Sequence, residues 1–282
     1  MFTNTTIACI GSGSMAEAMI AGLIAQKLIG PQSIVASGPR VDRGEQLRLK
    51  HGIRVTTNNR EAIEGAGVVV LSVKPQILPA VMHELKGHIQ PSAVVLSIIA
   101  GAKIETIGQG LLHTGVVRAM PNTPAQIGQG ITVWTASPEV TDPQLKQAEA
   151  ILGACGQTVH VGDEDYLDMA TALSGTGPAY VFLFMEALVD AGVHLGFSRH
   201  VAEQLVLQTV KGSVEYVLHS PNHLARLRNQ VTSPGGTSAE ALYYLEKAGF
   251  RTALSRAVWA AYQRSVQLGK GKKRSQPPDG EK

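Results

Sequence analysis

Short runs of β-branched and other apolar residues alternate with stretches of helical spacing through residues 1–161. Apolar runs of this length are typical of strands that are buried on both faces of a parallel sheet. After the first run, Met15, Met19 and Leu23 are spaced for one face of a helix. Strand and helix repeated in this order predict an α/β domain with a doubly wound, mostly parallel sheet. The runs that we assign to strands are Thr6–Ile10, Ser33–Ala36, Val68–Leu71, Val94–Ser97, Val116–Ala119 and Gln157–Val161.

The composition of the chain changes near Gly162. Most of the aromatic residues lie beyond this point, and the short valine-rich runs give way to long helical periods. We therefore expect two domains, residues 1–161 and residues 162–268. Residues 269–282 are rich in Lys, Gly, Pro and Ser and are expected to form a disordered tail.

Two long helices are predicted in the second domain. Pro178–Ala191 is apolar nearly all round, and Arg199–Leu218 carries apolar residues in helical register. A helix that is apolar on every side must be enclosed, and an all-helical layer of about 110 residues offers few neighbours for that purpose. We therefore predict a dimerisation domain that buries these helices against a second copy of the chain.

Charge and cysteine content exclude several classes of protein. The net charge of +3 comes entirely from Lys270–Lys282, so the body of the chain is neutral and has no electrostatic footprint for nucleic acid. Cys9 and Cys155 cannot form a disulfide framework or a thiolate metal site, and the nine histidines are scattered. No metal site is therefore expected, and a reducing compartment fits.

The amino end lacks the cationic front of a secretory signal, since the first cation is Lys27. No uninterrupted apolar run approaches the roughly 20 residues that span a bilayer. We expect a cytoplasmic protein that does not bind a membrane.

A glycine-rich turn follows the first predicted strand. Gly11, Ser12, Gly13, Ser14, Met15 and Ala16 lead from this strand into a helix. Glycines in this position permit a tight turn and a close approach of pyrophosphate, and the amino end of the helix supplies unpaired N–H groups. The alternative is a plain glycine turn, but the strand-turn-helix setting favours a Rossmann dinucleotide site.

The second predicted strand ends without the acidic residue that usually binds the ribose 2′-hydroxyl of NAD. The stretch from Ala36 to Arg40 offers the Ser37 hydroxyl and the Arg40 guanidinium, which suit a 2′-phosphate. NADPH is therefore preferred, although Arg40 could be an ordinary surface arginine. At the same edge of the sheet, Lys74 with Pro75, Ser97–Gly101 and Arg118–Pro124 are expected to border the cofactor.

A second glycine turn lies in the helical part. Thr237 followed by Glu240 fits a capping box, which places a helix start at Thr237 after Pro234, Gly235 and Gly236. The simpler interpretation is a well-capped helix. The functional one is that Gly236, Thr237 and Ser238 present N–H groups to a carboxylate. If Thr237 uses its hydroxyl for the cap, Ser238 is the freer donor.

Five stretches make the chain resemble the pyrroline-5-carboxylate reductase family. They are the Gly11 loop, Ser72–Pro75, Met120–Pro124 (Met-Pro-Asn-Thr-Pro), Leu173–Tyr180 (Leu-Ser-Gly-Thr-Gly-Pro-Ala-Tyr) and Val231–Ser238 (Val-Thr-Ser-Pro-Gly-Gly-Thr-Ser). The last two together are highly specific, and the similarity spans nearly the whole chain. The family commonly has threonine where Ser238 stands, which keeps the hydroxyl.

The resemblance implies a Rossmann domain followed by a helical domain that interlaces with a partner, in dimers that often form decamers. It implies reduction of Δ1-pyrroline-5-carboxylate to L-proline with NAD(P)H, with Thr237 and Ser238 as the catalytic residues. The implied cofactor contacts are Ile10, Gly11, Ser12, Gly13, Ser14, Met15, Ser37, Asn59, Ser72, Val73, Lys74, Pro75, Ser97, Ile98, Ile99 and Glu164, beside the Arg40 inferred above. The implied substrate contacts are Gln230, Thr237 and Ser238, beside Gly236.

Two other functions remain open from the sequence. A β-hydroxyacid dehydrogenase would share the two-domain plan but needs a catalytic lysine, for which Lys211 is the main candidate. A catalytically silent NADPH sensor could dimerise on the same helices.

Overall fold

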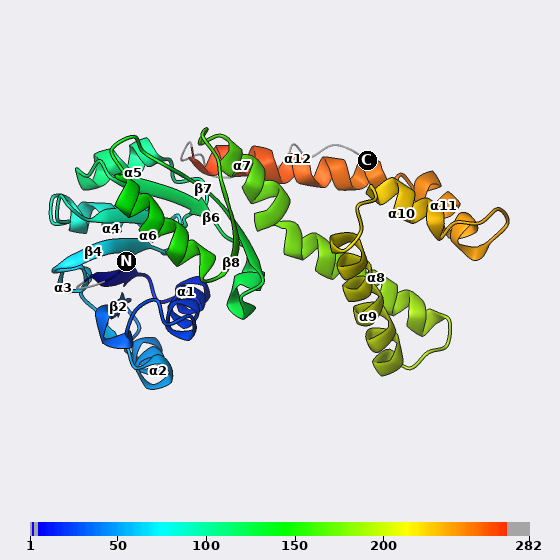
Figure 1. Ribbon diagram of the computed structural model, residues 1–282, viewed down its shortest axis with the longest axis horizontal. Coiled ribbons are helices and arrows are strands. Elements are labelled where there is room, and N and C mark those ends of the chain that lie inside the picture. Colours follow the sequence, from blue (N-terminus) through cyan, green and yellow to red (C-terminus); the bar gives the residue numbers. More distant parts are fainter. Residues whose placement is uncertain (1, 3–4, 270–282) are drawn as a thin grey trace, which may run out of the picture. The chain divides into compact units, whose positions relative to one another are not determined.

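The computed structural model describes Phe2 and residues 5–269, which divide into two compact units (Figure 1). The first unit runs to Thr176 and also takes in the chain from Ala261, while the second unit comprises Gly177–Ala260. The tail expected beyond Gly269 lies outside the described residues. Helix α12 (Phe250–Gly269) begins in the second unit and ends in the first.

Within the described residues, the first unit contains a sheet of eight strands in the order β3-β2-β1-β4-β5-β6-β7-β8. All neighbouring strands are parallel except β6 and β7, which confirms the predicted doubly wound, mostly parallel sheet. The strands are β1 (Thr6–Ile10), β2 (Ile34–Ser37), β3 (Arg54–Thr56), β4 (Ala66–Leu71), β5 (Val94–Ser97), β6 (Val116–Met120), β7 (Gly130–Ala136) and β8 (Gly156–His160).

Strands β3 and β7 were not predicted from the sequence. Strand β3 has only three residues and ends the sheet, so it lacks the continuous apolar run of a doubly covered strand. Strand β7 alternates buried and half-buried positions and pairs antiparallel with β6. Both strands therefore lack the sequence pattern by which we identified the other six.

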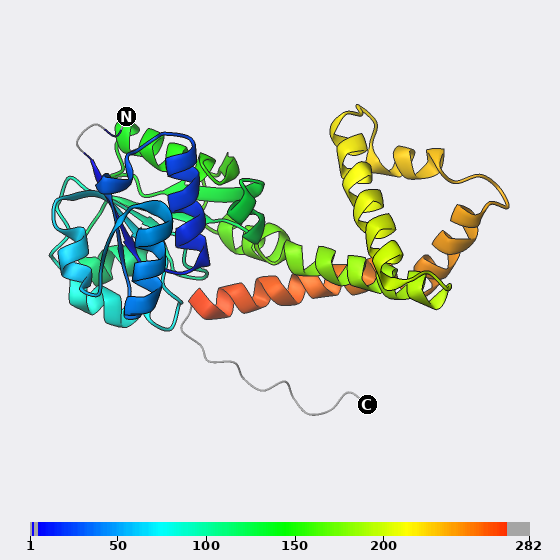
Figure 2. The same cartoon turned by 90° about the horizontal axis from the view of Figure 1, so that it is seen from below.

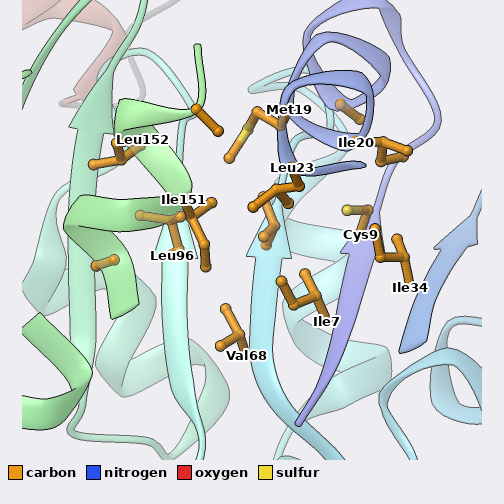
Figure 3. Packing of buried hydrophobic residues seen from close by; sticks show 14 of the residues in the cluster. Ile7, Cys9, Met19, Ile20, Leu23, Ile34, Val68, Leu96, Ile151 and Leu152 are labelled. Atoms are coloured by element: carbon orange, nitrogen blue, oxygen red, sulfur yellow. The ribbon is translucent and has the colours of Figure 1, made fainter. Parts of the chain in front are cut away.

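Helices cover both faces of this sheet. Alternate residues of β1 point to opposite faces, so that Ile7 and Cys9 belong to one buried cluster and Ala8 and Ile10 to the other. Figure 3 shows the first cluster, in which α1 and α6 pack over β1, β4 and β5. The helices of this unit are α1 (Ser14–Ala25), α2 (Val41–His51), α3 (Asn59–Ile63), α4 (Leu78–Leu85), α5 (Ile104–Leu111), α6 (Asp142–Gly153) and α7 (Tyr166–Ala170), which a π-helical turn (Thr171–Gly175) follows.

The second unit is helical, as predicted. Helices α8 and α9 pack against each other (Figure 2), and a Cβ on Gly192 would lie 3.0 Å from the Ala202 Cβ. The rings of Phe184 and Phe250 lie 6.5 Å apart. The helices are α8 (Gly177–His194), α9 (Arg199–Leu218), α10 (Leu224–Gln230) and α11 (Thr237–Lys247), together with the first part of α12.

Most of the apolar surface of α8 is open in the single chain. Phe182 is 59% exposed and Leu183 is 66% exposed, while Val189 is the buried residue of this helix. Large apolar side chains in such a position are expected to be covered by another surface. By length and composition alone, the helical stretch Tyr166–His194 could also cross a membrane.

Candidate active site

The glycine turn after β1 is held against the ends of two neighbouring strands. The Gly11 amide donates to the Ser37 carbonyl oxygen over 3.0 Å, and the Ser72 hydroxyl donates to the carbonyl oxygens of Ile10 and Gly11. Gly11 has φ +107°, and a Cβ there would lie 2.9 Å from the Ser72 backbone. The turn therefore requires glycine at this position for both its dihedral angle and its contact.

The amino end of α1 is open to a ligand. Gly13 is the N-cap residue, and among the described residues no side chain caps this end and no atom lies within 4 Å of a Cβ built on Gly13. The first amides of a helix lack acceptors within that helix, so the Ser14 and Met15 N–H groups remain available. Together with the helix dipole, they form a receptor for an anion such as the pyrophosphate of a dinucleotide.

Arg43 braces this turn from α2, a feature that the sequence did not reveal. Its Nε donates to the Ser12 carbonyl oxygen over 2.9 Å, and its guanidinium pairs with the Glu17 carboxylate on α1. Lys50 and His51 also reach Glu17, at 2.8 and 3.2 Å. Arg43 and Lys50 offset the negative charge of Glu17, which lies in the same helical turn as the proposed phosphate site.

The pairing of Glu17 is expected to make stability depend on pH. Hydrogen bonds from Lys50, and next from Arg43, lower the pKa of Glu17 to about 2. A lowered pKa adds stability that is present above the ordinary value of 4.5 and is lost as the pH falls toward 2. In urea denaturation, Glu17→Gln should be less stable than the wild type by about 1 kcal/mol at neutral pH, and the difference should shrink below about pH 5.

The matched control for this measurement is Glu149→Gln, because Glu149 is an exposed glutamate on α6. Its stability difference from the wild type should stay small over the same pH range. A Glu17→Gln difference that is the same at both ends of the range would contradict the assigned pairing.

The end of β2 differs from the expectation in one respect. Ser37 is fully buried, and its hydroxyl donates to Asn59 Oδ1 over 2.7 Å, so it is not available to a 2′-phosphate in this structure. The Asn59 Nδ2 donates in turn to Glu84 Oε2, also over 2.7 Å. Arg40 is exposed at the N-cap position of α2, where its guanidinium is accessible to a phosphate.

The other predicted cofactor residues gather at the same edge of the sheet. Ile10 is paired with Ser37 and Leu71, and Leu71 is paired with Ser97, so β1, β2, β4 and β5 end side by side. Ser72–Pro75 follows β4, with Lys74 exposed, and the turn Ile98–Gly101 follows β5. The structure therefore brings these residues together, as the parallel sheet predicts.

Glu164 lies beside this edge. Its Oε1 accepts a hydrogen bond from the Ile104 amide at 2.8 Å and from Arg118 Nη1 at 2.9 Å. Arg118 had been expected to border the cofactor, but its side chain is only 2% exposed and also pairs with Asp168. Glu164 and Asp168 therefore both bind the Arg118 guanidinium.

The second candidate site is the tip of α11. The predicted Thr237–Glu240 capping box is wrong, because Gly236 is the N-cap residue and no side chain caps this end within the described residues. Gly235 has φ +72°, and the Gly236 amide donates to the Ser233 carbonyl oxygen over 3.0 Å. This tight turn occupies the Gly236 N–H, which leaves those of Thr237 and Ser238 for an anion.

The missing cap changes the roles of two hydroxyls. Thr237 is exposed and Ser238 is half-buried, and neither hydroxyl is used at the helix start. Both are therefore available as donors to a ligand, rather than Ser238 alone. Gln230 is the exposed last residue of α10, in the same unit, and Lys211 is exposed on α9.

Two family models match the chain. The model described as pyrroline-5-carboxylate reductase dimerisation matches residues 164–268. The model described as NADP oxidoreductase coenzyme F420-dependent matches residues 6–101. The second match includes the glycine turn and the strand ends that carry the predicted cofactor residues.

Individual relatives match nearly the whole chain. A pyrroline-5-carboxylate reductase from Synechocystis is 44% identical and covers 93% of this chain and 97% of its own length. A solved pyrroline-5-carboxylate reductase from Coxiella burnetii has a TM-score of 0.86 at 37% identity, with coverage of 94% of this chain and 99% of its own. A Plasmodium falciparum pyrroline carboxylate reductase with NADP bound has a TM-score of 0.87 at 33% identity, covering 95% of this chain and 100% of its own.

Proposed function

The chain belongs to the pyrroline-5-carboxylate reductase family, and from this premise we infer that it reduces Δ1-pyrroline-5-carboxylate to L-proline with NAD(P)H, the last step of proline biosynthesis. The observation that carries this conclusion is the match to a relative with 44% identity over 93% of the chain. The open amino end of α1 supports it, since the exposed Gly13 leaves room for a dinucleotide pyrophosphate.

The reaction adds a hydride to the carbon of a cyclic imine, while its nitrogen takes up a proton from solvent before the transfer, so that the C=N bond becomes a single bond in the product. The nicotinamide supplies the hydride, so the protein contributes position and charge. We assign the Thr237 and Ser238 amides to the substrate carboxylate and the Ser238 hydroxyl to the ring nitrogen. Gln230 and Gly236 complete this proposed substrate site.

NADP is the proposed cofactor of preference. Ile10–Met15 would bind the pyrophosphate, while Ser72–Pro75, Ser97–Ile99 and Glu164 would border the rest of the nucleotide. Ser37 is a positioning residue in this scheme, because it orients Asn59 through their hydrogen bond. The recognition of the 2′-phosphate is therefore assigned to Arg40 alone.

Arg40→Ala is expected to weaken the use of NADPH much more than the use of NADH. It should raise the KM for NADPH about tenfold and change the KM for NADH less than about twofold, because only NADPH has the phosphate that the guanidinium binds. Steady-state kinetics with both cofactors would measure this. Arg48→Ala is the matched control, since Arg48 is exposed on the same helix and pairs with Glu45. Equal losses with NADPH and NADH would refute the assignment.

The protein forms a homo-oligomer through its helical part. The open apolar side chains of α8 fall within residues 164–268, which match a dimerisation model. A second copy is therefore the proposed cover for Tyr166–His194, in preference to a membrane. We further propose a homodimer that assembles into a decamer, and a cytoplasmic location. We also propose a domain boundary in the sequence near Gly162, where the dimerisation model begins to match, ahead of the division between the two compact units at Gly177.

The function is tested by mixing the protein, NADPH and pyrroline-5-carboxylate and following absorbance at the nicotinamide band. Absorbance should fall only when all three are present, with proline as the product. A flat trace with tight NADPH binding would favour a silent sensor. Turnover of a β-hydroxyacid in place of the imine would favour a dehydrogenase.

A further inference from the structure

Arg118 occupies an unusual place for a charged residue. It lies on β6, is 2% exposed, and is among the largest fully buried side chains of the chain. Its Nη1 pairs with Glu164 Oε1 at 2.9 Å and its Nη2 with Asp168 Oδ1 at 3.1 Å. One guanidinium thus holds two carboxylates in a largely dry environment, where their orientation is strongly constrained.

Each carboxylate oxygen that faces Arg118 accepts one more hydrogen bond. Glu164 Oε1 accepts from the Ile104 amide at 2.8 Å, and Ile104 is the first residue of α5. Asp168 Oδ1 accepts from the Ser265 hydroxyl at 2.7 Å, and Ser265 on α12 is 1% exposed. These two donors supplement the single cation, so the network joins β6, α7, the start of α5 and the last part of α12.

The same two helices border the turn Ile98–Gly101. Helix α5 begins three residues after Gly101, and its N-cap Lys103 makes no side-chain cap bond, so Glu164 provides the acceptor at this end. A Cβ on Gly101, which has φ +74°, would lie 2.8 Å from the Gly269 nitrogen and 3.0 Å from the Leu268 Cβ. The end of α12 therefore packs directly on this turn.

We propose that Arg118, Asp168 and Ser265 act together as positioning residues that fix the turn Ile98–Gly101 for the cofactor. The inference rests on the proposed function, in which this turn borders the nucleotide. Ser265 keeps the last part of α12 against the turn, and Arg118 keeps Glu164 at the start of α5. None of the three needs to touch the substrate, so their contribution should appear in cofactor binding rather than in the chemical step.

The test uses Ser265→Ala in the full-length protein. The change removes one hydrogen bond to a buried carboxylate, and the dissociation constant of NADPH, measured by fluorescence, should rise about fivefold. At saturating NADPH, kcat and the KM for pyrroline-5-carboxylate should stay within about twofold of the wild type. Hydrogen exchange should accelerate in the peptide that contains the Ala102 amide, which donates to the Ile99 carbonyl oxygen in the wild type.

Ser255→Ala is the matched control, since it makes the same change at an exposed position of the same helix. It should leave both NADPH binding and exchange at the turn unchanged. Gly101→Ala provides a second variant that acts on the turn itself, and it should weaken NADPH binding at least as much as Ser265→Ala. The proposal is overturned if Ser265→Ala binds NADPH as the wild type does, or if exchange rises equally throughout the first unit.

The binding measurement keeps this inference separate from the proposed function. Failure of the wild type to reduce the imine would count against the proposed function. An effect of Ser265→Ala on NADPH binding would still support the positioning role of Arg118, Asp168 and Ser265. If the wild type reduces the imine and Ser265→Ala binds NADPH normally, the positioning role is rejected and the proposed function is retained.

Discussion

Gly11→Ala is expected to cause a loss of both stability and NADPH binding. Gly11 has φ +107°, a region that residues with a Cβ rarely adopt, and the new Cβ would lie 2.9 Å from the Ser72 backbone. Strain of this kind costs about 1–3 kcal/mol, and relieving the clash must separate the ends of β1 and β4. NADPH affinity should therefore fall at least about a hundredfold, as measured by fluorescence titration, with a clearly lowered midpoint of denaturation.

Gly13→Ala should behave differently from Gly11→Ala. Gly13 has φ −75°, and its added Cβ meets no protein atom within 4 Å, so the fold should be retained. The same methyl group would occupy the space that we assign to the pyrophosphate, so NADPH binding should still be weakened. Gly30→Ala, with φ −73° and equally open surroundings, is the control that should change neither quantity. Normal NADPH binding by Gly13→Ala would place the cofactor elsewhere.

Ser238→Ala is expected to lower kcat/KM for pyrroline-5-carboxylate by about tenfold to a hundredfold. The change removes a hydroxyl that no helix cap uses and that we assign to the ring nitrogen. A hydrogen bond to a charged group contributes roughly 1.5–3 kcal/mol, which corresponds to a loss of this size. The dissociation constant of NADPH should change little, because the residue is assigned to the substrate alone.

Ser238→Thr is the matched variant, since it keeps the hydroxyl at the same position. It should retain most of the activity that Ser238→Ala loses. If both variants lose activity equally, packing at the tip of α11 rather than the hydroxyl is responsible. Equal losses of catalysis and of NADPH binding in Ser238→Ala would also reject its assignment to the substrate.

The buried strands were predictable because burial on both faces of the sheet requires apolar residues at successive positions. Strands β1, β4 and β5 are covered on both faces, and each therefore appears as a short continuous apolar run. The glycine turn was predictable for a related reason, since a turn between strand and helix that approaches another backbone requires glycine. The order of these elements was enough to place Ile10, Ser37, Leu71 and Ser97 at one edge.

Features that depend on side chains distant in sequence could not be predicted in this way. Arg118 and Asp168 are 50 residues apart, and Ser265 lies 97 residues beyond Asp168, so no local pattern connects them. Arg43 reaches Ser12 across 31 residues for the same reason. A buried strand that contains one arginine is a signal of a pairing, but it does not identify the partners.

The Thr237 capping box failed at a single residue. The pattern placed the helix start correctly at Thr237, but Thr237 is the first helical residue after a glycine N-cap and not the cap itself. Helix ends inferred from sequence are uncertain by this amount, and here the shift decides whether a hydroxyl is used for structure or left for a ligand.

Because the open side chains Phe182 and Leu183 lie in the part of the chain that forms the homo-oligomer, the stability of this protein depends on association between chains. Folding that ends in association is at least second order, so the apparent denaturation temperature should increase with protein concentration. A newly made chain exposes these apolar side chains until it associates with another copy. Aggregation is therefore expected mainly in the interval between synthesis and assembly.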